Sequence, residues 1–386
     1  VLFPVVARGS DSVLPQESPF DRPCAVKRLH DACQNRVRIL LSSIGKGLRK
    51  DAQLPSSCLI FPRMRRRPFE RGIATLSFDT ELIWGYIDTF GERQFSERYP
   101  GAIEAHDRLL DRLTTGNVRA TWFVVGAMTL PGSQGKCDER MRGLPRSWIN
   151  KVPAGTERTA PLCYRRSFFD RLKKASPQQE IGLHGGLAHV VWDHPEVSRE
   201  VAERELAQGI RAMKEAGVTP MSFSHPRERE RYHDLLPKYG IRCYRSRTPT
   251  LAFRMGRTLP GAALRLAEEM RRAAPPPVWP VRKMSGLWTV PASLFMYPIG
   301  DSRNRVVPLQ SRVERFRKGI EAAARQKGVF HYCFHPDNLA ESPDGFTMLD
   351  EMLECLTRAR DAGDIQISPM GDIAEFMERS YPKATH

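Results

Sequence analysis

The sequence predicts an α/β protein whose parallel strands form a barrel, and three observations favour this fold class. After Gly72, short β-rich runs alternate with amphipathic helical stretches, which is the pattern of parallel strands joined by helical crossovers. No G-x-G-x-x-G motif follows the first run, so an open dinucleotide-binding sheet is disfavoured. Polar residues gather at the carboxyl ends of the runs, where the catalytic groups of barrel enzymes collect.

The elements can be assigned in order from apolar periodicity. Strands are predicted for the short β-rich runs at residues 73–79, 118–126, 180–184, 221–225, 241–245, 286–291, 328–334 and 364–368. Helices are predicted between them at residues 102–113, 196–217, 312–326 and 345–363, where apolar residues recur at helical spacing. Two long segments rich in Pro or Arg, residues 127–165 and 246–285, are predicted to be insertions into this alternation.

Composition divides the 386-residue chain into two predicted parts, a basic extension at residues 1–71 and a catalytic barrel at residues 72–386. Residues 1–72 hold fourteen Lys and Arg against six Asp and Glu, and the whole chain has a net charge of +16. Within the extension only residues 26–48 have the pattern of an amphipathic helix. Its basic run PRMRRRPFER (62–71) is typical of a solvated, flexible tail, with binding to nucleic acid or anionic lipid as the less favoured alternative.

The sequence also predicts where the protein resides. No run of about eighteen apolar residues is present, so no transmembrane segment is expected. The first residues lack the basic and apolar regions of a secretory signal. The eight cysteines are widely spread without a C-x-x-C pair, which argues against a disulfide framework or a cysteine zinc site. Reduced thiols in a cytoplasmic protein are the simplest expectation.

Two acidic residues end the first predicted strand, in the stretch SFDTELIWG (77–85). Because side chains alternate along a strand, Asp79 and Glu81 are expected on the same side. One interpretation is a pair of helix N-caps, which is a common role for acids after a strand. The other is a division of labour in which one carboxylate holds a metal ion and the other acts as a base.

Histidines cluster in EIGLHGGLAHVVWDH (180–194), behind another apolar run. Imidazole is the commonest protein ligand for zinc and similar ions, although surface histidines also cluster by chance. On a helix, His184 and His189 would lie about 140° apart, so the Gly-Gly pair between them predicts a loop that can bring them together. His194 precedes a proline and is expected to lead into the next helix.

A second pair of histidines lies in HYCFHPDN (331–338), at the end of the seventh run. His331 and His335 are an even number of residues apart, so both can project into a barrel lumen. His335, at the end of the strand, is better placed to meet a substrate. His331, deeper in the strand, is predicted to be a hydrogen-bonded core residue.

Taken in order, the segments SFDTE, ATWFVVG, EIGLHGGLAH, SFSHPR, GIRCYRS and FHPDN resemble the polysaccharide deacetylase family (carbohydrate esterase family four, the NodB-homology domain). The resemblance covers residues 72–376. It implies a distorted (β/α)7 barrel of the NodB-like deacetylase type, and a metal-dependent N-deacetylase that uses zinc or another divalent ion.

The resemblance also implies roles for individual residues. Asp79 matches the catalytic base, while Thr80 stands where the family usually has a second Asp. Glu81 is therefore the expected metal ligand, together with His184 and His189. These histidines have four residues between them, one more than the usual motif.

Three further roles are carried over. Arg227 matches the arginine that the family places near the catalytic Asp, and His335 matches the catalytic histidine. Trp84 and Trp288 are candidate substrate-binding platforms for a sugar ring, with core packing as an equal alternative.

The resulting functional prediction is a hydrolase that removes N-acetyl groups from an amino sugar in a polysaccharide, glycolipid or sugar nucleotide. The absent second Asp and the longer histidine spacing are the grounds for a second hypothesis, a catalytically impaired, metal-free relative that only binds glycans. A nucleic-acid binder driven by the basic extension is the third and least favoured hypothesis, so no stable nucleic-acid partner is expected.

Overall fold

The computed structural model describes residues 68–256, 258–299 and 307–382. Almost all of the predicted extension, including the candidate helix at 26–48, lies outside the described residues. The fold is organised around β1 (Gly72–Thr80), a strand in which every residue is buried. Burial on both faces explains why its sequence is nearly continuous in apolar and small residues.

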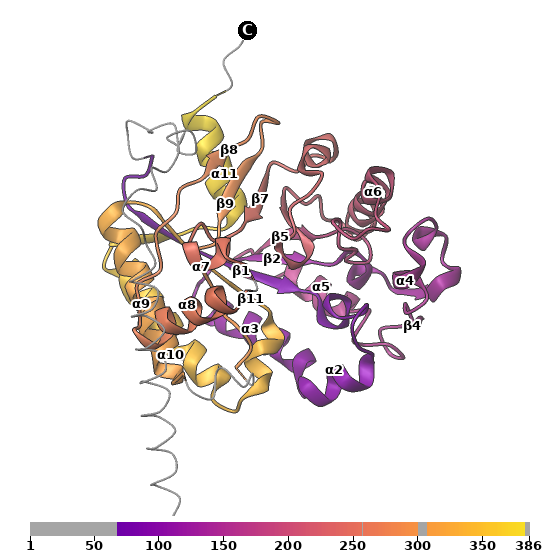
Figure 1. The fold of residues 1–386 in the computed structure, drawn as a ribbon, viewed down its shortest axis with the longest axis horizontal. Coiled ribbons are helices and arrows are strands. Elements are labelled where there is room, and N and C mark those ends of the chain that lie inside the picture. Colours follow the sequence, from indigo (N-terminus) through magenta and orange to yellow (C-terminus); the bar gives the residue numbers. More distant parts are fainter. Residues whose placement is uncertain (1–67, 257, 300–306, 383–386) are drawn as a thin grey trace, which may run out of the picture. The chain divides into compact units, whose positions relative to one another are not determined.

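The strands beside β1 run parallel to it, as the alternation of strands and helices predicts (Figure 1). On one side β1 pairs with β11 (Val329–Phe334), and on the other with β2 (Thr121–Val124). Four more parallel strands follow β2 in the order of the chain. They are β5 (Glu180–His184), β6 (Ser222–Ser224), β7 (Cys243–Ser246) and β9 (Trp288–Pro291).

The sheet curls back on itself where β9 ends. The next strand, β10 (Leu294–Phe295), pairs with β11 rather than with β7. Of the two residues between them, Ala292 donates its N–H to Ser246 of β7 at 2.9 Å, and Ser293 donates to His331 of β11 at 2.8 Å. With β9 and β10 counted as one broken strand, the described residues form a seven-stranded ring, which confirms the predicted distorted (β/α)7 barrel.

Smaller strands extend this barrel. β12 (Ile365–Ile367) pairs with the first residues of β1, below the point where β2 begins to pair. β8 (Val281–Arg282) adds an antiparallel edge to β9. β3 (Gly132–Gln134) and β4 (Ala154–Thr156) form a separate antiparallel pair inside the predicted insertion at 127–165.

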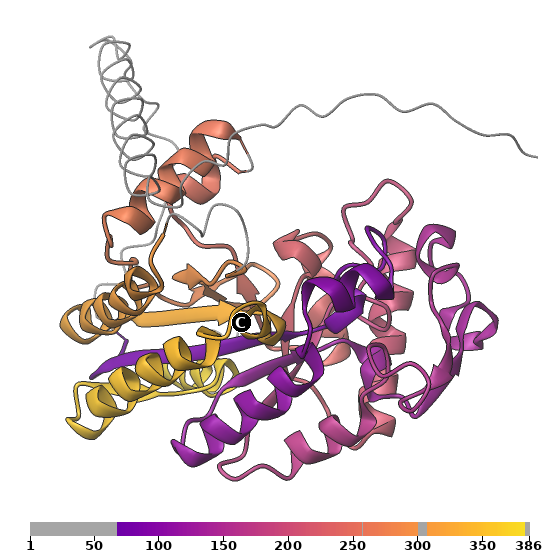
Figure 2. The same cartoon turned by 90° about the horizontal axis from the view of Figure 1, so that it is seen from below.

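All four predicted helices are present, as α3 (Ala102–Thr115), α6 (Arg199–Glu215), α9 (Leu309–Gln326) and α10 (Gly345–Asp361). Figure 2 shows α9 and α10 beside β1 and β11, and α9 contacts both strands. The predictions did not include α2 (Glu92–Arg98), α4 (Arg146–Ile149), α5 (Arg166–Lys173), α7 (Leu251–Arg254), α8 (Leu259–Met270) and α11 (Met370–Ser380). None of the helices in the described residues is long and apolar enough to cross a membrane.

Short 3-10 helices follow several strands and shape the barrel mouth. They are η2 (Leu82–Gly85), η3 (Gly126–Thr129), η4 (Gly135–Cys137), η5 (Glu139–Met141), η6 (Pro226–Glu228), η7 (His233–Tyr239) and η9 (Pro336–Glu341). Four of them, η2, η3, η6 and η9, begin within two residues of the end of a barrel strand. The residues predicted to do chemistry stand at these junctions.

Candidate active site

Glu81 follows β1 directly and occupies the N-cap position of η2. Its side chain makes no capping hydrogen bond, so the capping interpretation is wrong and the carboxylate is available to the barrel mouth. Gly85 makes room for it, because a Cβ at this position would lie 1.9 Å from Oε1 of Glu81. The carboxylate is therefore built into a closed space, and the residue is only 4% exposed.

His184 is the last residue of β5. Its Nδ1 lies 3.1 Å from the carbonyl oxygen of Ser224 at the end of β6. A carbonyl oxygen only accepts, so Nδ1 carries the proton. In the neutral ring, Nε2 then presents a lone pair, and this nitrogen lies 2.8 Å from Oε2 of Glu81. Such an arrangement is typical of a metal-binding imidazole, whose second nitrogen is fixed by a hydrogen bond.

His189 lies in the segment that follows β5, which we call the histidine loop (residues 185–192). Two of its residues have left-handed backbone conformations, Gly185 at φ +69° and His189 itself at φ +55°. The loop returns the second imidazole to the first, with their Nε2 atoms 3.2 Å apart. The prediction that the glycines mark a loop uniting the two histidines is confirmed.

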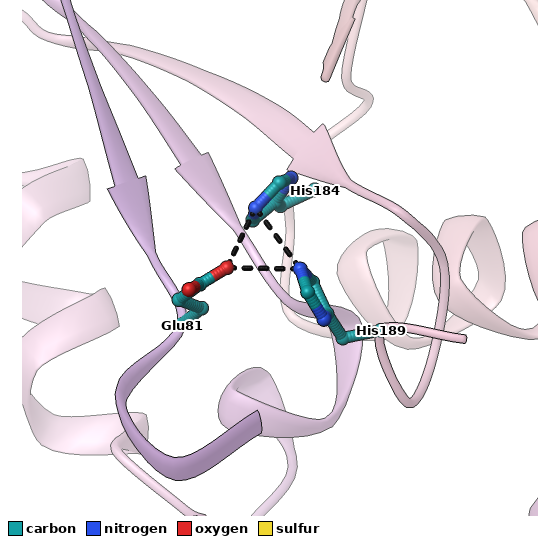
Figure 3. Close-up of side chains that lie close together, drawn as sticks. All are labelled: Glu81, His184 and His189. Atoms are coloured by element: carbon teal, nitrogen blue, oxygen red, sulfur yellow. Dashed lines mark hydrogen bonds and ion pairs between the residues drawn. The ribbon is translucent and has the colours of Figure 1, made fainter. Parts of the chain in front are cut away.

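The three side chains point toward one another (Figure 3). Oε2 of Glu81 lies 2.8 Å from Nε2 of His184 and 2.9 Å from Nε2 of His189. Three donor atoms bound tetrahedrally to one zinc ion at about 2.0–2.1 Å would be separated by about 3.3 Å, slightly more than the separations found here. The donor set and its spacing therefore fit a single divalent cation, and this buried group is a candidate metal site.

The charges around the triangle are those expected of a metal site. Although burial opposes ionisation, the hydrogen bond with His189 and the charge of His335 hold the pKa of Glu81 well below its usual range. Burial lowers the pKa of His189, which keeps its imidazole neutral. An ionised carboxylate facing a neutral imidazole is the protonation state that a divalent cation requires of its ligands.

Asp79 lies beside the triangle, and its partner is Arg245 rather than Arg227. Nη2 of Arg245 donates to Oδ2 of Asp79 at 2.6 Å, and both side chains are buried. Burial opposes ionisation of Asp79, but the charge of Arg245 outweighs it and lowers the pKa of the carboxyl group. The other oxygen, Oδ1, has no hydrogen-bond partner among the described residues.

The structure corrects the predicted contact of Arg227. This residue lies in η6 beyond the end of β6, and its guanidinium pairs with Asp88 and lies 3.4 Å from the carbonyl oxygen of Gly85. Arg245 instead lies inside β7, where its side chain reaches the barrel lumen. A sequence signal existed, since a charged residue within an apolar strand must have a buried partner.

His331 and His335 lie in separate environments, as predicted. His331 is fully buried, and its two ring nitrogens lie 2.8 Å from Oγ of Ser77 and 3.2 Å from the carbonyl oxygen of Pro291. His335 faces the acidic pair, with Nε2 at 3.0 Å from Oε1 of Glu81 and 3.8 Å from Oδ2 of Asp79. Its side chain is 19% exposed, so it lies between the buried triangle and solvent.

Burial alone would lower the pKa of His335, but the neighbouring carboxylates reverse the effect. Glu81, and after it Asp79, raise the pKa to about 9. The ring is therefore protonated at neutral pH and can donate a proton. Asp79 and Glu81 both face this ring, as the alternation of strand side chains predicts.

The two tryptophans are not sugar platforms in this structure. Trp84 is fully buried within η2 and donates its indole N–H to the carbonyl oxygen of Cys163 at 2.8 Å. Trp288 in β9 is 2% exposed. Neither ring offers a face to a substrate, because both belong to the core.

His194 lies outside the triangle, against the ring of Trp148, and α6 begins shortly after it at the Ser198 cap.

No model of a known protein family matches the chain, and no curated protein matches it. Solved structures do resemble it. One is a candidate polysaccharide deacetylase from Mycobacterium smegmatis, with a TM-score of 0.53, 19% identity and coverage of 80% of this chain and 91% of that one. Another is a probable polysaccharide deacetylase from Pseudomonas aeruginosa PAO1, with a TM-score of 0.50, 11% identity and coverage of 80% and 92%.

A third similar structure is Puue allantoinase, with a TM-score of 0.52, 11% identity and coverage of 81% of this chain and 92% of that one. At these identities the likeness concerns architecture. The chain has the barrel fold of these polysaccharide deacetylase structures.

Proposed function

We propose that the protein is a metal-dependent hydrolase that removes N-acetyl groups from an amino sugar in a polysaccharide, glycolipid or sugar nucleotide. The observation that carries this proposal is the buried triangle of Glu81, His184 and His189, flanked by a carboxylate and a protonated imidazole. The shared fold with two structures named as polysaccharide deacetylases supports the substrate class.

Glu81, His184 and His189 would hold one divalent cation, for which zinc is the best candidate because the donors are two nitrogens and one oxygen. When bound there, the cation lowers the pKa of a water molecule and polarises the substrate carbonyl. The buried position of the triangle supports tight binding, since few competing water molecules reach the ligands.

Asp79 would take the proton from the attacking water. Its Oδ2 is held by Arg245, which keeps the carboxyl group ionised and fixes its plane. Its Oδ1 is left without a partner among the described residues and so can accept a proton. This is the role that the sequence predicted for Asp79, with Arg245 in place of Arg227 as the orienting cation.

His335 would protonate the departing amine. An amine leaves poorly unless it gains a proton, so an acid must stand near the base. Without a cation, Glu81 and Asp79 raise the pKa of His335 to about 9, and Asp79 still faces the ring when Glu81 holds the metal ion, which favours a protonated imidazole. Its partial exposure supports a position where the ring meets a substrate that enters from solvent.

The test is acetate release from N-acetylglucosamine oligomers by the zinc-loaded protein, with and without a chelator. We expect release that the chelator stops, and elemental analysis should find one metal ion per chain. The variant His184→Ala should lose both metal and activity, whereas His194→Ala, a histidine outside the triangle, should keep both.

The outcomes separate the alternatives. Oligomer binding without acetate release would favour the impaired glycan-binding relative. Full activity of His184→Ala would show that the ligand assignment is wrong.

A further inference from the structure

The histidine loop is held by backbone hydrogen bonds from two neighbouring elements. From η3, Gly126 donates its N–H to the carbonyl oxygen of Gly186 at 2.9 Å, and Ala127 donates to that of Leu187 at 2.8 Å. From the loop, Leu187 donates to the carbonyl oxygen of Glu205 in α6 at 3.1 Å. The first half of the loop is thus fixed between η3 and α6.

This close approach depends on small residues. A Cβ on Gly209 of α6 would lie 2.5 Å from the carbonyl carbon of Gly186, and a Cβ on Gly126 would lie 2.8 Å from the carbonyl oxygen of Gly186. Both contacts are shorter than any side chain allows. The loop, η3 and α6 therefore meet backbone to backbone, and this brings the side chain of Glu205 beneath the loop.

The carboxyl group of Glu205 binds the second half of the loop. Oε1 accepts hydrogen bonds from the N–H groups of Ala188 at 2.8 Å and Val190 at 3.2 Å. Oε2 lies 3.5 Å from the indole nitrogen of Trp192, which donates to it. Glu205 is fully buried, so these loop groups are its immediate environment.

The two backbone donors belong to the residues on either side of His189. Because both N–H groups point at a single oxygen atom, the peptide plane that enters Ala188 and the plane that leaves His189 are fixed. His189 has φ +55°, a left-handed conformation that costs free energy in a residue other than glycine. The contacts of Glu205 offset this cost, and the resulting turn aims Nε2 of His189 at Glu81.

We propose that Glu205 is a positioning residue for the metal site, which closes the turn at 188–190 and thereby places His189 in the triangle. This inference rests on the proposed metal-dependent function. It also accounts for the extra residue between His184 and His189, because the longer segment leaves the strand, forms the turn over Glu205 and returns to the first imidazole.

The proposal concerns hydrogen-bond acceptance rather than charge. Burial raises the pKa of Glu205 to about 7, so the group is partly neutral under ordinary conditions. Glutamine keeps an acceptor oxygen at the same reach. Aspartate keeps the ionisable group but is one methylene shorter, which withdraws the oxygen from both N–H groups.

The experiment compares Glu205→Gln, Glu205→Asp and Glu205→Ala for zinc affinity, measured by competition with a chromophoric chelator. The visible absorption of the cobalt(II)-loaded protein reports the coordination geometry. We expect Glu205→Gln to stay within about threefold of the original affinity. Loss of a group that orients a ligand typically costs about 10-fold to 100-fold, so Glu205→Asp and Glu205→Ala should bind correspondingly more weakly and show altered cobalt bands.

Matched controls are Glu200→Gln and Glu200→Asp, at an exposed position in the first turn of the same helix, and both should bind zinc normally. If Glu205→Ala fails to fold, the zinc affinities of Glu205→Gln and Glu205→Asp still test the inference. Equal zinc affinities of these two variants, or weaker zinc binding by Glu205→Gln than by Glu205→Asp, would overturn it. Absence of zinc binding by the unaltered protein would instead contradict the proposed function.

Discussion

The two halves of the candidate site are held in different ways. In the barrel lumen, Asp79 is held by side chains, since Arg245 bonds to both its carboxylate and Ser77, and Ser77 in turn bonds to His331. At the rim, His189 is held mostly through backbone groups of the histidine loop and through glycines that let elements touch. Removal of a charge should therefore destabilise the lumen half. Addition of a single methyl group should destabilise the loop half.

The largest expected loss of stability follows a substitution in the lumen half. Arg245→Met leaves Asp79 buried without its cation, and such a loss typically costs about 3–5 kcal/mol of stability. The free energy of unfolding in urea, measured on chelator-treated protein, should fall by this amount. Because Asp79 would then hold its proton to higher pH, acetate release by the zinc-loaded variant should also fall and recover only at alkaline pH.

Arg227→Met is the matched control for this change. Its partner Asp88 is partly exposed, so the pair should contribute no more than about 1 kcal/mol. Equal losses in the two variants would mean that Arg245 has no special place in the lumen.

A smaller loss of stability is expected from a substitution in the histidine loop. The added Cβ of Gly186→Ala would lie 1.8 Å from Oε2 of Glu205 and 2.4 Å from its backbone oxygen. The backbone contact cannot be relieved by a side-chain rotation, so the loop must shift. Overpacking of this kind typically costs about 1–3 kcal/mol. Calorimetric unfolding should show the loss, and zinc affinity should fall with it because His189 moves.

Gly91→Ala provides the comparison, since a Cβ there meets no atom within 4 Å. Gly91 is the N-cap of α2, where alanine costs up to about 1 kcal/mol, and zinc affinity should not change. A Gly186→Ala variant with unaltered zinc affinity would contradict the account of the loop half.

The contrast between the lumen half and the loop half also explains which parts of the site could be predicted from the sequence. Asp79, Glu81, His184 and His335 stand at the ends of apolar strands, and parallel strands end at one edge of a barrel. Their convergence follows from the pattern of apolar runs. The pairing of Asp79 could not be predicted in this way, because Arg245 reaches it from a strand on another part of the barrel wall, whereas the match to the family motif indicated Arg227.

The conformation of the histidine loop was also beyond the sequence pattern. The glycines indicate a loop, but its shape depends on Glu205, which lies in a later helix and carries no sequence signal beyond being an acid in an amphipathic pattern. The position of Trp84 was left open between the core and the substrate site for a related reason. The turn of η2 directs its ring into the core, and η2 was not among the predicted elements.

A pH dependence of stability is also expected, and it originates in the loop half. The folded chain raises the pKa of Glu205 to about 7, from an ordinary value of 4.5. Between these two pH values the folded state holds a proton that the unfolded chain has released, so stability falls as pH rises through this window. The contribution has a slope of at most about 1.4 kcal/mol per pH unit and ends above the folded pKa.

Glu205→Gln isolates this contribution, because it keeps the acceptor oxygen and removes the titration. The difference in unfolding free energy between the unaltered protein and this variant should change in favour of the variant as pH rises from about 4.5 to 7, and then stay constant. Urea unfolding of chelator-treated protein at four or five pH values measures it. A difference that is independent of pH would mean that Glu205 is ionised throughout, and that the loop turns around a buried carboxylate rather than a neutral acid.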